Sequence, residues 1–294
     1  LSILARRILA STGETPPDNL HPAAVQAIIA LNSPPYREAI GGSFGTTVPG
    51  IFTDEPSVHD RHSRFEDGLG WIPWTGGFAA FFRDRRGYDP YGFISQVFFD
   101  GPESARIRHD YWRTVTELFS ETYTRRLGEW CAENRLQFTG HFLWENHLGT
   151  ATRTSGAIMP HYRYQQMPGI DMLCEQADET ITVKQCSSVA NQYGRPRVIS
   201  ELYGCVGWEF SFEGQKWLGD WQFAMGVNVR SQHLALYSLR GCRKRDYPPV
   251  FNYNNAWWRH NRIVEDYFAR LSAALTLGVP VRDLLIVHPA STAW

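Results

Sequence analysis

The sequence lacks the features that would assign it to several common classes of protein. Its five cysteines are widely spaced, with an odd count and no CxxC pair, so neither a zinc knuckle nor a disulfide framework is indicated, and we expect buried free thiols. No apolar run approaches the ~20 residues of a membrane span. GxGxxG and GxxxxGKS/T are absent, and so is a GxSxG context around Ser187 and Ser188, which argues against nucleotide-binding proteins and serine hydrolases.

An excess of charge of either sign is also missing. Lys and Arg total 29 against 30 Asp and Glu, a formal net charge of −1, so we expect neither nucleic acid nor a membrane surface as a partner. The 294 residues are 43% hydrophobic and 14% aromatic, which is enough apolar mass for one large core. The opening LSILARRILAST is too short and too interrupted for a signal peptide, so the sequence assigns no location.

Apolar periodicity predicts helices that alternate with short strands. Helical spacing begins at Pro22 and recurs over 111–134, 214–225 and 261–277. Six short apolar runs are typical of strands and lie at 46–56, 136–146, 169–174, 180–190, 197–204 and 226–239. Apolar strands that alternate with helices indicate an α/β fold in which both faces of a parallel sheet are covered.

Polar residues fall at the ends of the predicted strands. They are Glu55, Glu145, Asp171, Lys184, Glu201 and His233. In a (β/α)8 TIM-type barrel such ends converge on one mouth, so we favour a barrel over an open sheet. Only six of the eight strands are present, which predicts that residues 1–279 form a barrel truncated at its N-terminus, in a longer parent chain with further domains. Residues 280–294 are then the start of a following α/β domain or a final strand.

Glu145 and Glu201 are the candidate catalytic residues. Glycoside hydrolysis requires two carboxyl groups around one bond, one protonated to assist the leaving oxygen and one ionised to attack or to activate water. Glu145 would end the fourth barrel strand and Glu201 the seventh, with two strands between them, so they would face each other across the mouth. For either residue alone, an ion pair with a basic residue at the rim is the alternative.

Aromatic residues near these carboxylates are candidate walls of a sugar site. Rings present flat apolar surfaces on which the C–H faces of sugars stack. Tyr203 and Trp208 lie beside Glu201, and further tryptophans lie in loop-like regions or beside Glu145, namely Trp71, Trp74 and Trp144. Ordinary packing in the core is the alternative for such rings.

The other candidate substrate-binding residues lie at or near strand ends. They are Glu55, His141, Asp171, Asn228 and His233. His141 precedes Glu145 by four residues, so on a strand both side chains would point to the same side. His141 would then bind substrate or set the protonation of Glu145, with a hydrogen-bonded core histidine as the alternative.

Two other chemistries are weaker candidates. Asp54, Glu55, His59 and His62 combine carboxylates with imidazoles, but their spacing lacks an HExxH or EF-hand pattern, so a structural corner is preferred to a metal site. Lys184 invites a Schiff-base interpretation, as in a lyase or aldolase. It ranks below the Glu pair because no phosphate-binding glycine loop comes after it.

Taken together, several ordered motifs resemble the catalytic barrel of bacterial α-L-rhamnosidases. They cover about residues 20–294 and are GIFTDEP, FTGHFLWENHLG, MPGIDML, VKQCSSVANQYGR, VISELYGCVGW, GDWQFAMGVN and RKRDYPP. The resemblance implies an exo-acting glycosidase on polysaccharide side chains, with Glu145 as general acid and Glu201 as the second carboxylate. It also implies assistance by Ca²⁺, although the carboxyl chemistry itself requires no cofactor.

The resemblance leaves the stereochemical outcome and one rival function open. Rhamnosidases of this type are inverting, whereas carboxylates on the fourth and seventh strands are typical of retaining enzymes, and the carboxyl separation distinguishes the two. A barrel that binds carbohydrate without catalysis would keep the aromatic residues and need no acid. Together with the Lys184 lyase, it is the alternative to a glycosidase.

Overall fold

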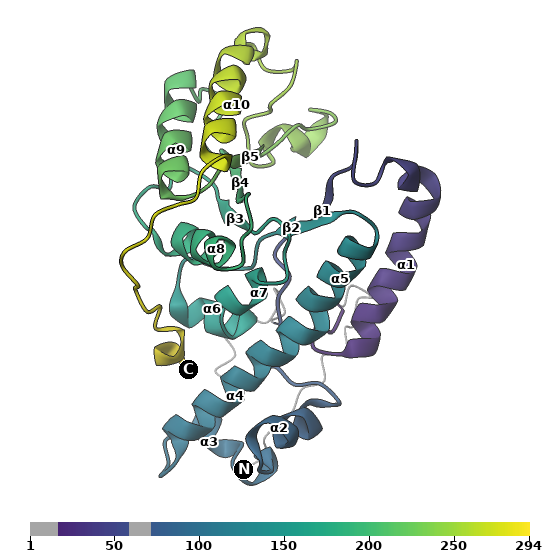
Figure 1. Ribbon diagram of the computed structural model, residues 1–294, viewed down its shortest axis with the longest axis vertical. Coiled ribbons are helices and arrows are strands. Elements are labelled where there is room, and N and C mark those ends of the chain that lie inside the picture. The colour runs from purple at the N-terminus through teal and green to yellow at the C-terminus, as the bar shows by residue number, and fades with distance from the viewer. Residues whose placement is uncertain (1–16, 59–71) are drawn as a thin grey trace. The chain divides into compact units, whose positions relative to one another are not determined.

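The computed structural model of the chain describes residues 17–58 and 72–294. These residues belong to two units (Figure 1). Unit 1 comprises the chain up to Phe138 together with Phe142–Gln165 and Pro289–Trp294, and unit 2 comprises Thr139–His141 and Gln166–His288.

Unit 2 is built from parallel strands joined by helices. Its elements in chain order are β3 (Gly169–Met172), α8 (Ile181–Gln192), β4 (Ile199–Leu202), α9 (Phe212–Met225), β5 (Val229–Gln232) and α10 (Arg262–Thr276). The strands pair in the order β3-β4-β5, all parallel, so each strand lies beside its successor in the sequence. Helices α9 and α10 lie side by side (Figure 1), and the Tyr267 hydroxyl on α10 donates to Asp220 Oδ1 on α9 at 2.8 Å.

The register of these strands decides which side chains share a face. Asp171 pairs with Glu201, which in turn pairs with Ser231. In the row of paired residues one position earlier on each strand, the last residue is Arg230. Its guanidinium donates to Glu265 Oε2 of α10 at 2.8 Å. Because successive side chains of a strand point to opposite faces, Asp171 and Glu201 point away from the face that α10 covers.

Hydrophobic packing closes the helix-covered side of unit 2. One cluster of buried residues joins the end of β4 to α9 and to the loop before α10, and it contains Leu202, Tyr203, Phe210, Leu218 and Phe251. Within the cluster, the rings of Tyr203 and Phe251 stack with centroids 5.8 Å apart. Burial of large rings is the main apolar contribution to the stability of such a layer.

Unit 1 is mostly helical. Its helices are α1 (Pro22–Ile40), α2 (Phe78–Arg86), α3 (Ser95–Phe98), α4 (Ser104–Phe119), α5 (Arg125–Glu133), α6 (Leu148–Ser155) and α7 (Met159–Tyr162). A short π-helical segment at Ser120–Thr124 joins α4 and α5 into one long helical rod (Figure 1). The apolar stripe of that rod carries buried Tyr111, Val115 and Phe119, and the Tyr111 ring packs on Phe78 of α2.

A short two-stranded sheet completes the described strands. It consists of β1 (Gly50–Thr53) and β2 (Gln137–Gly140), and Gln137 N–H donates to Pro49 C=O at 2.9 Å. The last two residues of β2 belong to unit 2. There Gly140 lies against β3 so closely that a Cβ on Gly169 would come within 2.8 Å of the Gly140 carbonyl oxygen. Glycine at 169 therefore lets the end of β2, and His141 after it, approach β3.

The α/β class with parallel strands is confirmed, and so are the four predicted helices, which correspond to α1, the α4–α5 rod, α9 and α10. One predicted strand is wrong, because residues 181–190 fall in the helix α8. The tail at 280–294, expected to be a final strand or the start of a following domain, contains a 3-10 turn at Ala290–Ala293. The described residues form five strands, in sheets of two and three, and they close no barrel. None of the helices that the structure describes is long and apolar enough to cross a membrane.

Candidate active site

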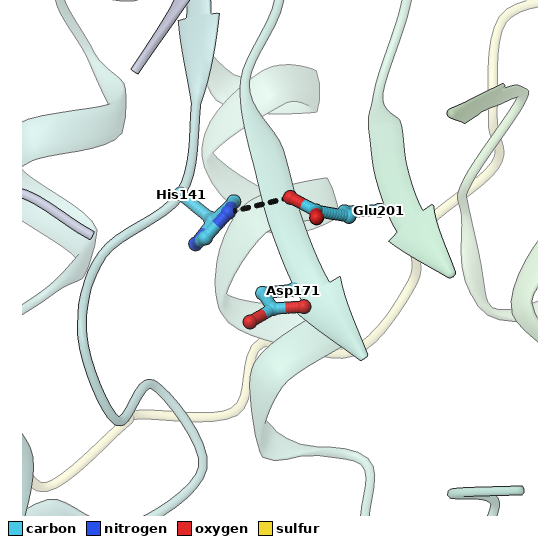
Figure 2. A group of neighbouring side chains, drawn as sticks. All are labelled: His141, Asp171 and Glu201. Carbon is cyan, nitrogen blue, oxygen red and sulfur yellow. Dashed lines mark hydrogen bonds and ion pairs between the residues drawn. The ribbon is translucent and has the colours of Figure 1, made fainter. Parts of the chain in front are cut away.

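Three side chains that can bind a proton or a metal ion meet in unit 2. Asp171 of β3 and Glu201 of β4 are partners in the parallel register, and His141 is the residue directly after β2. One ligand atom from each residue lies within 4.8 Å of the other two. Figure 2 shows the imidazole of His141 pointing to the carboxylate of Glu201, with the carboxylate of Asp171 nearby.

Two imidazoles contact the Glu201 carboxylate. His141 Nε2 lies 2.9 Å from Glu201 Oε2, and His233 Nε2 lies 3.6 Å from Oε1. His233 is held in place because it is the first residue after β5 and its backbone N–H donates to Leu202 C=O at 2.9 Å. Its ring also packs on Tyr247, with centroids 5.6 Å apart. The side chain of Glu201 is 18% exposed, so one part of it remains accessible to a substrate.

The surroundings of Glu201 favour its ionised form. Burial alone would raise the pKa of the Glu201 carboxyl, but the hydrogen bond and charge of His141 lower it, and the charge of His233 adds to this effect. The net result is a lowered pKa. Glu201 is therefore a charged group at neutral pH, suited to act as a nucleophile, a general base or a metal ligand.

The donor set fits a divalent cation only in part. Asp171 and Glu201 offer carboxylate oxygens, which are the ligands that Ca²⁺ takes. His141 offers an imidazole nitrogen, which suits zinc and other transition metals and is not a usual ligand of Ca²⁺. The two carboxylates therefore fit Ca²⁺, and the imidazole fits a role as hydrogen-bond partner to Glu201.

Four of the nine predicted site residues meet in this place: His141, Asp171, Glu201 and His233. The sequence did not single out Tyr247, which packs on His233. Tyr247 lies in the motif RKRDYPP, and its position in an irregular segment gives no periodic signal that would have identified it.

Tyr203 is not a wall of the site. It is fully buried in the core cluster, where its hydroxyl donates to Gln215 C=O at 2.7 Å. Burial, as the main cause, raises the pKa of its phenol to about 12. The physical reason is the backbone: Tyr203 has φ of 74°, a left-handed conformation that breaks the alternation of β4 and turns the ring away from the side of Glu201.

Asn228 is a structural residue at the opposite end of its strand. It precedes β5, whereas His233 comes after it. The Asn228 amide accepts from Val198 N–H at 2.8 Å and donates to Pro196 C=O at 2.8 Å. The amide also donates to the Thr276 hydroxyl at 3.4 Å. A buried amide with these hydrogen bonds holds two strand starts together and does not face the carboxyl ends of the strands.

Trp208 and Glu55 lie in loops. The indole of Trp208 is partly buried and donates to Lys244 C=O at 3.1 Å. Glu55 lies two residues beyond β1 in unit 1 and has a left-handed φ of 44°.

Two of the predicted wall tryptophans also belong to unit 1: Trp74 packs on Phe78 and Trp144 is exposed. Trp71, His59 and His62 lie outside the described residues.

Glu145 lies in a turn and not at a strand end. Strand β2 stops at Gly140, so His141 and Glu145 are not on one strand and the same-side argument is wrong. The Glu145 side chain is buried in unit 1, where Oε1 accepts hydrogen bonds from Phe142 N–H at 3.0 Å and from the Tyr162 hydroxyl. One described strand, β3, lies between β2 and the strand of Glu201, in place of the two expected.

Lys184 is not at a strand end either. It lies on α8, is exposed, and donates from Nζ to Met225 C=O at 3.0 Å. Partial burial of the Lys184 side chain is the main cause that lowers the pKa of its ammonium, and the charge of Arg282 lowers it further. A lysine on the outer helix cannot present its amine at the carboxyl ends of the strands, so the Schiff-base interpretation is not supported.

Comparison with known proteins identifies relatives of the chain. A family model described as alpha-L-rhamnosidase matches residues 11–290. No curated protein matches. A solved structure of a rhamnosidase from Novosphingobium sp. PP1Y is similar, with a TM-score of 0.72 and 22% sequence identity, over 89% of this chain and 25% of that one. At this identity the similarity concerns the fold, and the chain spans about a quarter of the length of that rhamnosidase.

The family match has the wider reach of the two, because it extends over nearly the whole sequence and includes every residue around Glu201. The chain therefore belongs to glycoside hydrolase family 106, described as alpha-L-rhamnosidase.

Proposed function

We propose that this chain carries the catalytic centre of a glycoside hydrolase that cleaves α-L-rhamnosides. The proposal rests on the carboxylate of Glu201, which two imidazoles hold beside Asp171 at the end of β4. In parallel α/β folds the catalytic groups are presented at the carboxyl ends of strands. Family membership supports rhamnose as the sugar, and an exo-acting role on polysaccharide side chains is the substrate class that we favour.

Glu201 takes the role of the ionised carboxylate. Its lowered pKa suits a group that attacks the anomeric carbon or activates a water molecule, and it does not suit a proton donor. His141 fixes one carboxylate oxygen and His233 faces the other, so the two imidazoles orient the group before substrate binds. Asp171, in register with Glu201, is positioned to accept hydrogen bonds from sugar hydroxyls.

Glu145 is proposed as the general acid, the second carboxyl group that glycoside hydrolysis requires. This role is drawn from the resemblance of the motif FTGHFLWENHLG to rhamnosidases, and the motif lies within the residues 11–290 that the family model matches. Its contacts with Phe142 N–H and the Tyr162 hydroxyl give the carboxyl group a fixed position in its turn. A fixed position is a requirement for proton transfer to a leaving oxygen.

The finer architecture is proposed to be part of a (β/α)8 barrel. In a barrel each parallel strand lies beside its successor with a helix between them, and the order β3-β4-β5 with α8 and α9 obeys this rule. A doubly wound sheet reverses its strand order at a switch point instead. Residues 1–279 are then proposed as the barrel portion.

A calcium ion is proposed to assist the reaction. Asp171 and Glu201 would hold it through carboxylate oxygens, and the remaining ligands that Ca²⁺ takes would come from water and sugar hydroxyls. A bound cation of this kind supplies positive charge that orients hydroxyl groups and offsets the repulsion between two neighbouring carboxylates.

Replacement of Glu201 tests the central proposal. Glu201→Gln keeps the shape of the side chain and removes its charge, so we expect kcat on p-nitrophenyl α-L-rhamnopyranoside to fall by about 10²–10⁴-fold. The matched control is Glu209→Gln, which removes an exposed carboxylate from the loop after β4 and is expected to leave kcat unchanged. Equal activity of the Glu201→Gln variant and the wild type would refute catalysis by this group.

Glu145→Gln separates an acid role from a structural one. A general acid matters little when the leaving group is p-nitrophenol, which departs readily as an anion, and matters greatly for an alkyl or sugar leaving group. We expect the variant to lose much more activity on a disaccharide than on the aryl rhamnoside. Tyr162→Phe, which removes one hydrogen bond to the carboxyl and keeps the carboxyl itself, is the control. An equal loss on both substrates would assign Glu145 to folding of its turn.

The imidazoles predict the pH dependence of activity. Because ionised Glu201 is required, kcat/KM should rise with pH through the pKa of that group in the free enzyme. His141 lowers this pKa by a hydrogen bond and by charge, so His141→Gln should move the acidic limb to higher pH. His233→Gln should move it in the same direction by less, since its contribution is charge alone. A limb that stays in place in both variants would contradict the assignment.

Cation binding is tested without an activity readout. A ligand that binds only the folded state raises the melting temperature, so Ca²⁺ should stabilise the wild type in a concentration-dependent way. Asp171→Asn should abolish most of that shift, whereas Asp178→Asn, which alters a carboxylate seven residues later, should retain it. An equal shift in wild type and Asp171→Asn, or no shift in either, would exclude this site for Ca²⁺. Parallel titration with Zn²⁺ tests the imidazole as a ligand.

A further inference from the structure

Two exposed cysteines lie beside each other just beyond the strands that carry Asp171 and Glu201. Cys174 is the second residue after β3, and Cys205 is the third residue after β4. Both are free and exposed, and so is Cys242, whereas Cys131 and Cys186 are buried. The expectation of buried thiols from the sequence is therefore wrong for three of the five cysteines.

The backbone brings the first two cysteines into the range of a disulfide. Cys174 N–H donates to Gly204 C=O at 2.7 Å, so the parallel pairing of β3 and β4 continues past the strands. Neighbouring strands lie about 4.8 Å apart, and disulfides join Cα atoms that are about 4.4–6.8 Å apart. Cys174 and Cys205 both have left-handed φ values, of 59° and 66°.

The surroundings of the Cys205 thiol favour its protonated form. Burial of part of its side chain is the main cause that raises the pKa of the Cys205 thiol, and the neighbouring Cys174 thiol raises it further. The negative charges of Asp171 and Asp246 act in the same direction. Attack by the Cys205 thiolate is therefore slow at neutral pH and becomes faster as pH rises.

We propose that Cys174 and Cys205 are a site of reversible disulfide formation, which joins the ends of β3 and β4 through exchange with a small disulfide such as oxidised glutathione. In the first step one cysteine thiolate attacks a sulfur of the glutathione disulfide, and one glutathione leaves as a thiolate. In the second step the other cysteine thiolate attacks the protein sulfur of that mixed disulfide and releases the second glutathione. The two cysteines lose two electrons and two protons, and glutathione disulfide becomes two glutathione thiols.

The cross-link would act on the strands of the candidate site. It would close a ring that contains α8 and β4, and so would hold the carboxyl ends of the two strands at a fixed spacing. Closing such a ring lowers the conformational entropy of the unfolded chain and so raises the free energy of unfolding. The site is independent of the proposed glycosidase activity, because it rests on the two thiols and the strand pairing alone.

The test treats the native protein with oxidised glutathione at pH 8, blocks the remaining thiols, and maps tryptic peptides without reduction. Trypsin separates residues 164–184, which contain Cys174, from residues 198–216, which contain Cys205. We expect these two peptides joined, two hydrogens lighter than their sum, and separated again by dithiothreitol. Cys242→Ser should form the same cross-link, whereas Cys174→Ser should leave Cys205 with a single bound glutathione.

Melting temperature gives a second and independent measurement. The oxidised wild type should melt several degrees above its reduced form, and Cys205→Ser should show no such difference. The proposal is overturned if the wild type carries a separate glutathione on each of Cys174 and Cys205. It is also overturned if Cys242 becomes modified while both of the others stay reduced, because that result shows an active reagent and an unreactive pair.

Discussion

The in-register parallel pairing of β3, β4 and β5 is the constraint on which the candidate site depends. It sets Asp171 directly opposite Glu201 and places both on the face that α10 does not cover. A slip of one residue would exchange the two faces and bury both carboxylates among the helices. The paired residues on the other face end at Arg230, whose guanidinium is almost fully buried and forms an ion pair with Glu265. The same slip would expose this guanidinium, so the ion pair opposes the slip.

Left-handed residues at the strand ends determine the path of the chain beyond each strand. Cys174, Tyr203 and Cys205 all have positive φ, which costs free energy for a residue with a side chain and so requires compensation from the surroundings. The compensation at Tyr203 is visible, since its ring enters the core and its hydroxyl is hydrogen-bonded. The carboxylates, three or four residues before the two cysteines, lie on the side of the imidazoles.

Local patterns in the sequence predicted the helices α1, α4–α5, α9 and α10 and the cores of the five described strands, and failed at α8, where a second periodicity competed. The run at 180–190 is rich in β-branched residues, which favours a strand, yet Val183, Cys186 and Ala190 recur at helical spacing and are among the residues that α8 buries. All four residues of the cluster around Glu201 were sequence candidates at or near strand ends, but the sequence could not predict which of the nine candidates would meet. His141 enters it through the close approach of Gly140 to Gly169, a contact between segments that are distant in the sequence.

The two glutamates that the sequence singled out have opposite relations to their surroundings. Glu145 is 4% exposed, and hydrogen bonds from Phe142 N–H and the Tyr162 hydroxyl hold its carboxyl group in place. Glu201 is partly buried beside a second carboxylate, an arrangement that opposes folding unless positive charge compensates. His141 and His233, each directly after a separate strand, lower the pKa of the Glu201 carboxyl and so keep it ionised. A fold that only needed an apolar strand end would have no use for this arrangement, and that is the physical reason to place the chemistry at Glu201.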